Sequence, residues 1–373
     1  MRHGQLAESP HDITPLGWRD VAWRLFNEVQ QDRVMLVAAG ATYYMLIAMV
    51  PGLALFVSLY GLFNDPADVY RQVGLLSGVL PQGGMSIITD QLTRLAATGK
   101  PTLGLTLIIS LAVALWSSNA GVQSFFDAMN IAYDEPEKRN YFVRLLLGFV
   151  FTLAFAIAAI LFLAVVVVIP VVMQFLYLGH GFEWLVKVSS YALMLVLTFA
   201  GLTALYRWGP SRERAKWRWV TPGAIFSVVL IALVSVLFSW YAANFSNYNA
   251  TYGSLGALIG FLTWMWLSAT IVITGAELNS ELEHQTSRDS TTGAPLPLGL
   301  RGAYMADHVA VVGRNAPADG KEKTTRVRDA APAEGPTAPS RTTGGDIGFA
   351  LGLVGLLLLA SSVVRPRNRR GSR

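Results

Sequence analysis

Long apolar segments recur along the first three quarters of the chain, and almost no charged residue interrupts them. A helix needs about 20 mainly apolar residues to cross the hydrocarbon core of a lipid bilayer. Polar or basic stretches separate the segments that reach roughly this length. The pattern therefore predicts an all-α, polytopic transmembrane helix bundle. Its six core helices are expected at residues 34–63, 102–118, 145–178, 184–206, 220–242 and 254–278.

A further apolar segment lies near the end of the chain, after a stretch rich in Pro, Gly, Ala, Thr and charge that is typical of disorder. Its length of about 27 Å as a helix is enough to cross a bilayer. We predict a seventh helix with the C-terminus outside; a re-entrant segment and a sorting-type tail are the alternatives. The predicted divisions are a cytoplasmic tail at 1–33, the six-helix domain at 34–283, a disordered cytoplasmic linker at 284–346, the seventh helix at 347–364 and a basic tail at 365–373.

Hydrophobic residues also recur at helical spacing before the first core segment, and Thr14 followed by Pro15 is a favourable helix start. Arginines occupy the other side of this helix. Such an amphipathic helix lies flat on a membrane surface, and we predict an interfacial helix here. A short soluble helix packed on the loops is the alternative. The apolar positions are Trp18, Ala22, Leu25, Phe26 and Val29.

Charge sets the expected orientation. Only 14% of the residues are charged, against about a quarter in a typical soluble domain. Lys and Arg gather before the first core segment, between the second and third, between the fourth and fifth, and after the sixth. Because basic loops stay in the cytoplasm, this distribution puts both ends of the six-helix core there.

The chain has no cysteine, which excludes disulfides and thiolate metal ligands.

A polar stripe follows the second core segment. Its members recur every three or four residues and so share one face of a helix. A stripe this close to an apolar span faces protein or water, which suggests a substrate path or gate. The alternative is an amphipathic cytoplasmic extension with a solvated face. The candidate polar path consists of Asn119, Gln123, Asp127 and Asn130.

Two acidic residues, Glu277 and Glu281, stand one turn apart at the end of the sixth core segment. Helix carbonyls at this end disfavour a carboxylate unless a cation pairs with it. We expect a buried charge here, with Arg139, Arg144 or Arg207 as the partner. A structural ion pair and a proton-coupling carboxylate are the two interpretations.

Two further features concern the last two core segments. Gly256 and Gly260 form a small-residue seam that permits close helix packing. The external turn between these segments is dense in residues that tolerate unusual backbone angles and form hydrogen bonds. It either caps the outer mouth of a cavity or is a self-bonded connection. Its candidate residues are Asn247, Asn249, Tyr252 and Gly253.

Several motifs together resemble the YihY/BrkB family of bacterial inner-membrane proteins. They are AAGATYYMLIAMVPGLALF in the first segment, the WSSN stretch running to Tyr133 with Glu137-Lys138-Arg139, LYRWGP, VTPGA, and NYNATYGSLG followed by WMWLSATIVITGAELNSEL. The resemblance covers residues 18–283. It implies six transmembrane helices, a bacterial cytoplasmic membrane and no established biochemical activity, with members linked to virulence or serum resistance and to transport. The seventh apolar segment departs from the pattern.

The family has also carried the label ribonuclease BN, which the residues do not favour. Metal-dependent ribonucleases need clustered His and Asp ligands, whereas the five histidines are scattered over termini and loops. We therefore expect no metal, no cofactor, no enzymatic activity and no nucleic-acid partner. The basic, tryptophan-rich loop at 207–218 is better explained by orientation and anionic lipid headgroups.

The sequence favours a transporter-like or flippase-like bundle that moves a small or amphipathic solute. The alternative is a non-transporting scaffold or assembly factor of the envelope, with a membrane hydrolase well behind. Expected partners are membrane lipids, with a homo-oligomer as an open alternative, and the substrate is not identified by any motif. A continuous polar cavity reaching the bilayer midplane favours transport, and a solidly packed bundle favours a scaffold.

Overall fold

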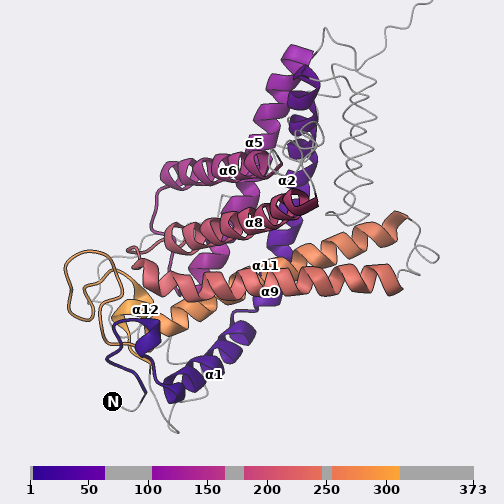
Figure 1. Cartoon of the computed structure of the whole chain (residues 1–373). Coiled ribbons are helices and arrows are strands. Elements are labelled where there is room, and N and C mark those ends of the chain that lie inside the picture. The colour runs from indigo at the N-terminus through magenta and orange to yellow at the C-terminus, as the bar shows by residue number, and fades with distance from the viewer. Residues whose placement is uncertain (1–2, 64–102, 164–179, 246–253, 311–373) are drawn as a thin grey trace, which may run out of the picture. The chain divides into compact units, whose positions relative to one another are not determined.

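The computed structural model describes residues 3–63, 103–163, 180–245 and 254–310 (Figure 1). The chain divides into two compact units, Met1–Ala316 and Pro317–Arg373. The predicted seventh helix belongs to the second unit and lies outside the described residues. Within the described ranges the first unit is helical, with one isolated β-bridge between Ala215 and Thr291 and no strand. Its helices are η1 (Pro10–Asp12), α1 (Pro15–Gln31), α2 (Val34–Phe63), α5 (Leu103–Ala132), α6 (Tyr141–Leu163), α8 (His180–Trp208), α9 (Trp217–Phe245), α11 (Ser254–His284) and α12 (Tyr304–Asp307).

Over its described residues, each predicted core segment coincides with a long helix. The bounds of α2 are those expected from the apolar pattern, and α5 carries the second segment and the polar stripe after it as one continuous helix. The described part of α6 ends at Leu163, and the rest of the third predicted segment lies outside the described residues. The all-helical class predicted from the sequence is confirmed.

Four described helices contain a stretch long and apolar enough to cross a membrane: Tyr141–Ala158, Val188–Trp208, Trp217–Tyr241 and Leu258–His284. A fifth candidate is α1 with the first half of α2, which pass the same criterion together but are bent by 60° at the break between them. Arg33 occupies this break with a positive φ of 50°, a backbone region that L-residues other than Asn and Asp seldom adopt. The described residues therefore contain four or five candidate spans.

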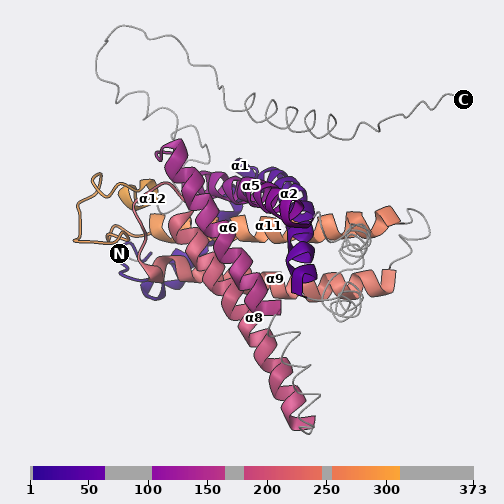
Figure 2. The same cartoon turned by 90° about the horizontal axis from the view of Figure 1, so that it is seen from above.

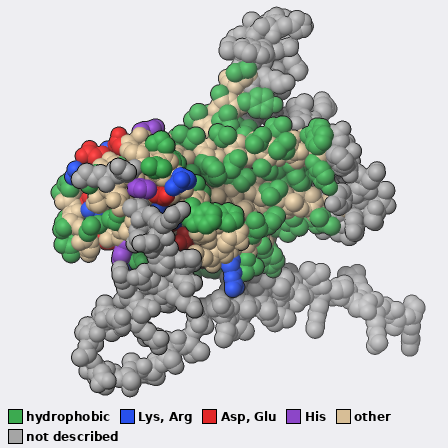
Figure 3. All heavy atoms as spheres, turned by 90° about the horizontal axis from the view of Figure 1, so that it is seen from below, with side chains coloured by type: hydrophobic (Ala, Val, Ile, Leu, Met, Phe, Trp, Pro, Cys, Tyr) green, Lys and Arg blue, Asp and Glu red, His purple; other side chains and the backbone are tan. Residues whose placement is uncertain are grey.

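The outer faces of these helices are apolar. Figure 3 shows hydrophobic side chains over most of one face, with charged side chains gathered at one end. No described protein segment covers these side chains, and burying them in lipid tails removes them from water. The exposed stripe of α6 consists of Phe142, Leu146, Val150, Leu153 and Ile157, and that of α9 includes Ile225, Val229, Leu233, Val236 and Trp240.

Helix pairs form the interior. α2 packs along α5, α11 packs on both α9 and α2, and α9 and α11 run side by side (Figures 1 and 2). Gly223 of α9 and Gly275 of α11 set the closest approach, since a Cβ on either would overlap neighbouring polar atoms. Gly260, predicted as part of the packing seam with Gly256, meets only the ring of Phe238, at an ordinary contact distance. The close approach thus lies further along α11 than the motif indicated.

The predicted amphipathic helix is α1, and Thr14 caps it by accepting a hydrogen bond from the backbone N–H of Gly17. Part of the expected apolar face packs on protein, since Leu25 and Val29 lie against the buried core. Gly17 and Val21 are buried and α1 packs on α11, whereas Trp18 and Phe26 are exposed. One face therefore contacts protein while the aromatic face stays uncovered.

Residues 285–310 were predicted to begin a disordered linker, and the structure corrects this. The backbone N–H of Ser287 donates to the carbonyl of Gln5, and Met305 is buried in the core. Buried Arg301 donates to three backbone carbonyls and thereby organises the loop around it. The polar composition of this segment suggested disorder. The ordering contact escaped notice because a single arginine that binds several backbone carbonyls produces no periodic sequence pattern. The external turn residues Asn247, Asn249, Tyr252 and Gly253 lie outside the described residues.

Candidate functional site

The charged residues gather where α5, α8 and α11 end and where α6 and α9 begin, and we call this region the charged end. Apolar spans cannot hold unpaired charges. The loops 133–140 and 209–216 and the segment 285–310 meet here, and α1 packs against the same end of α11. The candidate functional residues therefore lie among the ion pairs of this region.

A buried pair joins the loop after α8 to the end of α11. Arg212 donates through Nη2 to Oε2 of Glu283 at 2.7 Å, and their side chains are 2% and 0% exposed. The hydroxyl of Ser290 donates to the same carboxylate, and the guanidinium lies 4.6 Å from the ring centroid of Tyr133. Burial lowers the pKa of Arg212, but the charge of Glu283, its hydrogen bond and the influence of Tyr133 and Glu135 together outweigh burial and raise the pKa. The pair holds the guanidinium in its charged form.

A second pair joins α1 to α11. Nε of Arg24 donates to Oε2 of Glu281 at 2.5 Å, and Nη2 donates to Gln285 at 2.8 Å. Glu277, one turn earlier, is 1% exposed, interacts with the side chain of Asp32, and has no hydrogen-bond partner at Oε1. Helix α1 thus supplies Arg24 as the cation for Glu281. The α1–α2 break supplies Asp32 as an acidic neighbour of Glu277.

These contacts correct the expected partners of Glu277 and Glu281. Arg139 donates to Glu137 at 2.7 Å, Arg144 pairs with Asp127 at 2.8 Å, and Arg207 stacks on Trp217. The expectation considered only arginines in loops at the same end. It placed α1 on the membrane surface and so did not consider Arg24.

The polar stripe on α5 contacts α6. Arg144 of α6 donates to Gln123 and, through Nη2, to both carboxylate oxygens of Asp127 at 2.8 Å. We call these three residues the α5–α6 latch. Further along α5, buried Asn119 has no hydrogen-bond partner at Oδ1, and Gly148 of α6 lies against it. At the other end of the stripe, Asn130 donates to Glu137 and accepts from the backbone N–H of Ser211.

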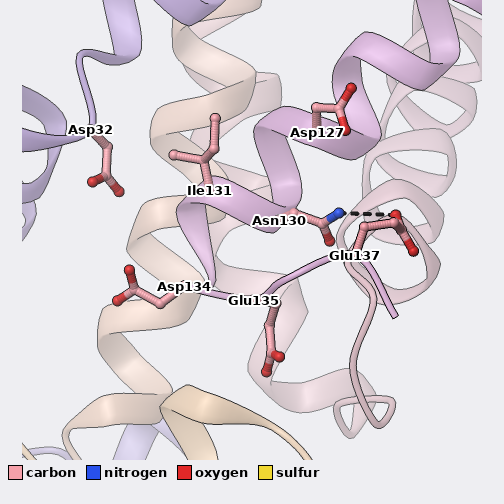
Figure 4. A pocket seen from close by; sticks show the side chains of 7 residues that line it. All are labelled: Asp32, Asp127, Asn130, Ile131, Asp134, Glu135 and Glu137. Carbon is pink, nitrogen blue, oxygen red and sulfur yellow. Dashed lines mark hydrogen bonds between the residues drawn. The ribbon is translucent and has the colours of Figure 1, made fainter. Parts of the chain in front are cut away.

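An acidic hollow of about 500 Å³ opens at the charged end beside this stripe (Figure 4). Its lining comes from the α1–α2 break, from the last turns of α5 and from the turn that follows α5. Of the predicted path residues, Asp127 and Asn130 reach the hollow, whereas Gln123 and Asn119 continue along α5. The acidic turn DEPEK was not recognised as part of a site, although its charge density was the available signal. The lining residues are Asp32, Asp127, Asn130, Ile131, Asp134, Glu135 and Glu137.

Basic side chains hold several of the hollow's carboxylates in place. Besides the latch, Lys138 pairs with Glu135 at 2.7 Å, and Arg139 pairs with Glu137. Burial raises the pKa of Glu137, but hydrogen bonds from Arg139 and Asn130 outweigh it and lower the pKa to about 2. Glu137 thus keeps its charge near neutral pH, and a hollow lined by carboxylates is suited to binding cationic or hydrogen-bond-donating groups rather than to covalent catalysis. Within the described ranges, no group of three or more His, Asp or Glu is placed to hold a metal ion.

Acidification is expected to weaken the charged end through Glu137. A carboxylate whose pKa is lowered on folding stabilises the folded state above its unfolded pKa of 4.5, and this contribution is lost as the pH falls towards about 2. The wild-type melting temperature in detergent should therefore decrease between these pH values more than that of Glu137→Gln. Parallel curves for the two proteins would contradict the expectation.

Comparison with known proteins places these features in context. Residues 25–296 match the family described as "Virulence factor BrkB". A "Putative ribonuclease-like protein YfkH" of Bacillus subtilis is 28% identical over 260 residues, which cover 66% of this chain and 88% of that protein. A "UPF0761 membrane protein" of Xanthomonas campestris is 28% identical over 269 residues, which cover 70% of this chain. The matched region spans 59% of that relative's length. No solved structure matches.

The word ribonuclease in one relative's name leads to a direct test. We expect the purified chain to show no RNA cleavage above background, with or without added Mg²⁺, Mn²⁺ or Zn²⁺. Metal-dependent cleavage needs clustered His and Asp ligands, whereas the histidines of this sequence are scattered over termini and loops. Degradation of a labelled RNA should be compared with a mock purification from cells lacking the chain, since contaminating nucleases are the main confounder. Cleavage that is abolished by a point substitution in this chain would overturn the expectation.

Proposed function

The chain belongs to the virulence factor BrkB family, and from that premise we propose that it is a transporter-like or flippase-like membrane protein that moves a small or amphipathic solute. One observation carries the proposal. The acidic hollow shares Asp127 and Asn130 with the polar stripe of α5, and the stripe extends past the α5–α6 latch to buried Asn119. An interior carbonyl without a hydrogen-bond partner costs free energy, and a path for polar solute would offer it a partner.

The latch gives the proposed path a closed and an open state. Arg144 bridges Gln123 and Asp127 and thereby holds the ends of α5 and α6 together. A cationic or hydroxyl group entering the hollow would compete for Asp127 and release the guanidinium. Separation of the two helix ends would then give access to Gln123 and Asn119. In such a mechanism polar side chains near the span replace covalent chemistry.

The proposed topology has six core spans in a bacterial inner membrane, with the N-terminus and the charged end in the cytoplasm. It rests on the distribution of basic residues. Reporter fusions at Lys138 and Lys216 should give a cytoplasmic signal, and an external signal from either would contradict the arrangement.

For the proposed seventh helix, protease added outside sealed spheroplasts should remove an epitope placed after Arg373. Cleavage only after lysis would exclude that helix.

Proteoliposomes test the transport proposal. Purified full-length protein should accelerate the flipping of at least one fluorescent phospholipid, or the uptake of one amine-bearing solute from a panel, relative to protein-free vesicles. Arg144→Gln should change that rate about tenfold, because it removes the charged contact with Asp127. Arg19→Gln is the matched control, since Arg19 is exposed on α1 and away from the stripe.

A non-transporting scaffold is the second candidate, and one observation favours it. The hollow lies at the charged end, while buried ion pairs tie α1 and the loop after α8 to the same end of α11. A bundle locked in this way is suited to holding other envelope proteins. Absence of movement across the whole panel, with correctly folded protein, would favour this candidate.

A further inference from the structure

Arg207 stands apart from the other partly buried arginines of the charged end. It occupies the last turn of α8, with its guanidinium carbon 4.2 Å from the ring centroid of Trp217 and 5.8 Å from that of Trp208. The two indole rings meet edge to face, 5.6 Å apart. A guanidinium over an indole ring within about 6 Å is attracted by the ring's electron density. The aromatic rings therefore fix the position of this charge.

No carboxylate within the described ranges lies within salt-bridge distance of Arg207, whereas five other arginines here are paired. Nε and Nη1 of Arg207 are also buried without a hydrogen-bond partner. Arg214 lies close enough to add a second positive charge, and the first turn of α9 contains no acidic residue. Among the described residues, the guanidinium of Arg207 therefore has no anionic partner. The paired arginines are Arg24, Arg139, Arg144, Arg212 and Arg301.

The position of this group identifies the kind of anion. Trp208 ends one candidate membrane span and Trp217 begins the next. Tryptophans at span ends lie at the depth of the lipid headgroups, which is also where the phosphates of a bilayer lie. Trp217 is exposed, and Ile225 and Val229 on the exposed surface of α9 follow it along the helix. An anion here therefore has an apolar helix surface beside it.

We propose that Arg207, Trp208 and Trp217 form a binding site for the phosphate group of one anionic glycerophospholipid in the leaflet that meets the charged end. The guanidinium donates to the phosphate oxygens, a pairing for which its planar shape is suited. Arg214 favours a headgroup with net negative charge, and the acyl chains lie along the exposed surface of α9. The site depends on membrane insertion and goes beyond the proposed solute movement, since a lipid would be bound there even by a scaffold.

Native mass spectrometry of the purified full-length protein tests the site. Protein in a neutral detergent is titrated with phosphatidylglycerol or with phosphatidylcholine of the same chains. Wild type should retain one phosphatidylglycerol with an apparent affinity at least tenfold higher than for phosphatidylcholine. Arg207→Gln should lower the affinity for phosphatidylglycerol about tenfold. The matched control is Arg218→Gln, which removes the same charge from an exposed position beside Trp217 and should stay within twofold of wild type.

The remaining outcomes are also decisive. Equal retention by wild type and Arg207→Gln would overturn the proposal, as would an equal loss in Arg218→Gln, which would indicate attraction by general charge. Inorganic phosphate and glycerol phosphate are added as soluble competitors. Displacement of the lipid by either at similar concentration would assign the site to a free phosphate and overturn the lipid assignment. If Arg207→Gln does not fold, Trp217→Leu removes the stacking surface from an exposed position, and its unchanged retention would equally overturn the proposal.

Discussion

Replacing Arg212 by alanine is expected to lower the free energy of unfolding by about 3–5 kcal/mol. The substitution leaves the carboxylate of Glu283 buried without its guanidinium. It also removes the cation over the ring of Tyr133, so the loop after α8 loses its attachment to α11. Denaturation in mixed detergent micelles, followed by tryptophan fluorescence and circular dichroism, measures the loss.

Two comparisons separate the lost pair from the lost packing. Lys138→Ala removes a cation that is 51% exposed from Glu135, and exposed pairs contribute less than about 1 kcal/mol. The double variant Arg212→Met with Glu283→Leu replaces both charges by apolar groups and should recover much of the stability, because buried pairs often stabilise no more than apolar residues of similar volume. A loss below about 1 kcal/mol in Arg212→Ala would show that Glu283 is satisfied without Arg212.

The helices were predictable because membrane insertion imposes a length on each apolar segment. The agreement between residues 34–63 and α2 reflects this constraint, as does the continuous helix formed by α5. The start of α1 was predictable for a similar reason, because the signals that set it, Thr14 and Pro15, lie within one helical turn. Features that depend on three or four neighbouring residues were thus accessible from the sequence.

The ion pairs were not accessible in the same way. Arg24 and Glu281 are 257 positions apart, and Arg212 and Glu283 are 71 apart. Charge alone indicated that the acidic end of α11 needed a cation, but each arginine at this end satisfied that requirement equally well. The bend at Arg33, which sets the direction of α1, carries no composition signal that distinguishes it from an ordinary turn.

The acidic hollow was predicted only in part. Asp127 and Asn130 followed from the helical spacing of the polar stripe, since both lie on α5. Asp32 comes from the α1–α2 break, and its approach to the end of α5 depends on how α2 packs along α5. Loops that meet only in the folded structure produce no periodic sequence pattern. Of the three elements that line the hollow, only the end of α5 was therefore predicted.

The Arg24→Ala variant is expected to lose about 3–5 kcal/mol, because Glu281 is 1% exposed at its side chain and would be left without its guanidinium. The attachment of α1 to α11 depends on the same contact, together with the hydrogen bond to Gln285. Limited proteolysis should therefore cut the α1 segment faster in the variant, and the melting temperature in detergent should fall.

Glu277→Gln is the matched comparison, and unlike Arg24→Ala it is not expected to lower the stability. Glu277 lies one turn from Glu281 and beside Asp32, with no described cation paired to it, so a neutral side chain of equal size breaks no ion pair and leaves no buried cation unpaired. Its stability should equal or exceed that of wild type, while Arg24→Ala is clearly destabilised. If both variants lose stability equally, Glu277 contributes as a charged group, and the division of roles between the two carboxylates is wrong. If neither loses stability, α1 is held on α11 by Val21 and its apolar neighbours alone.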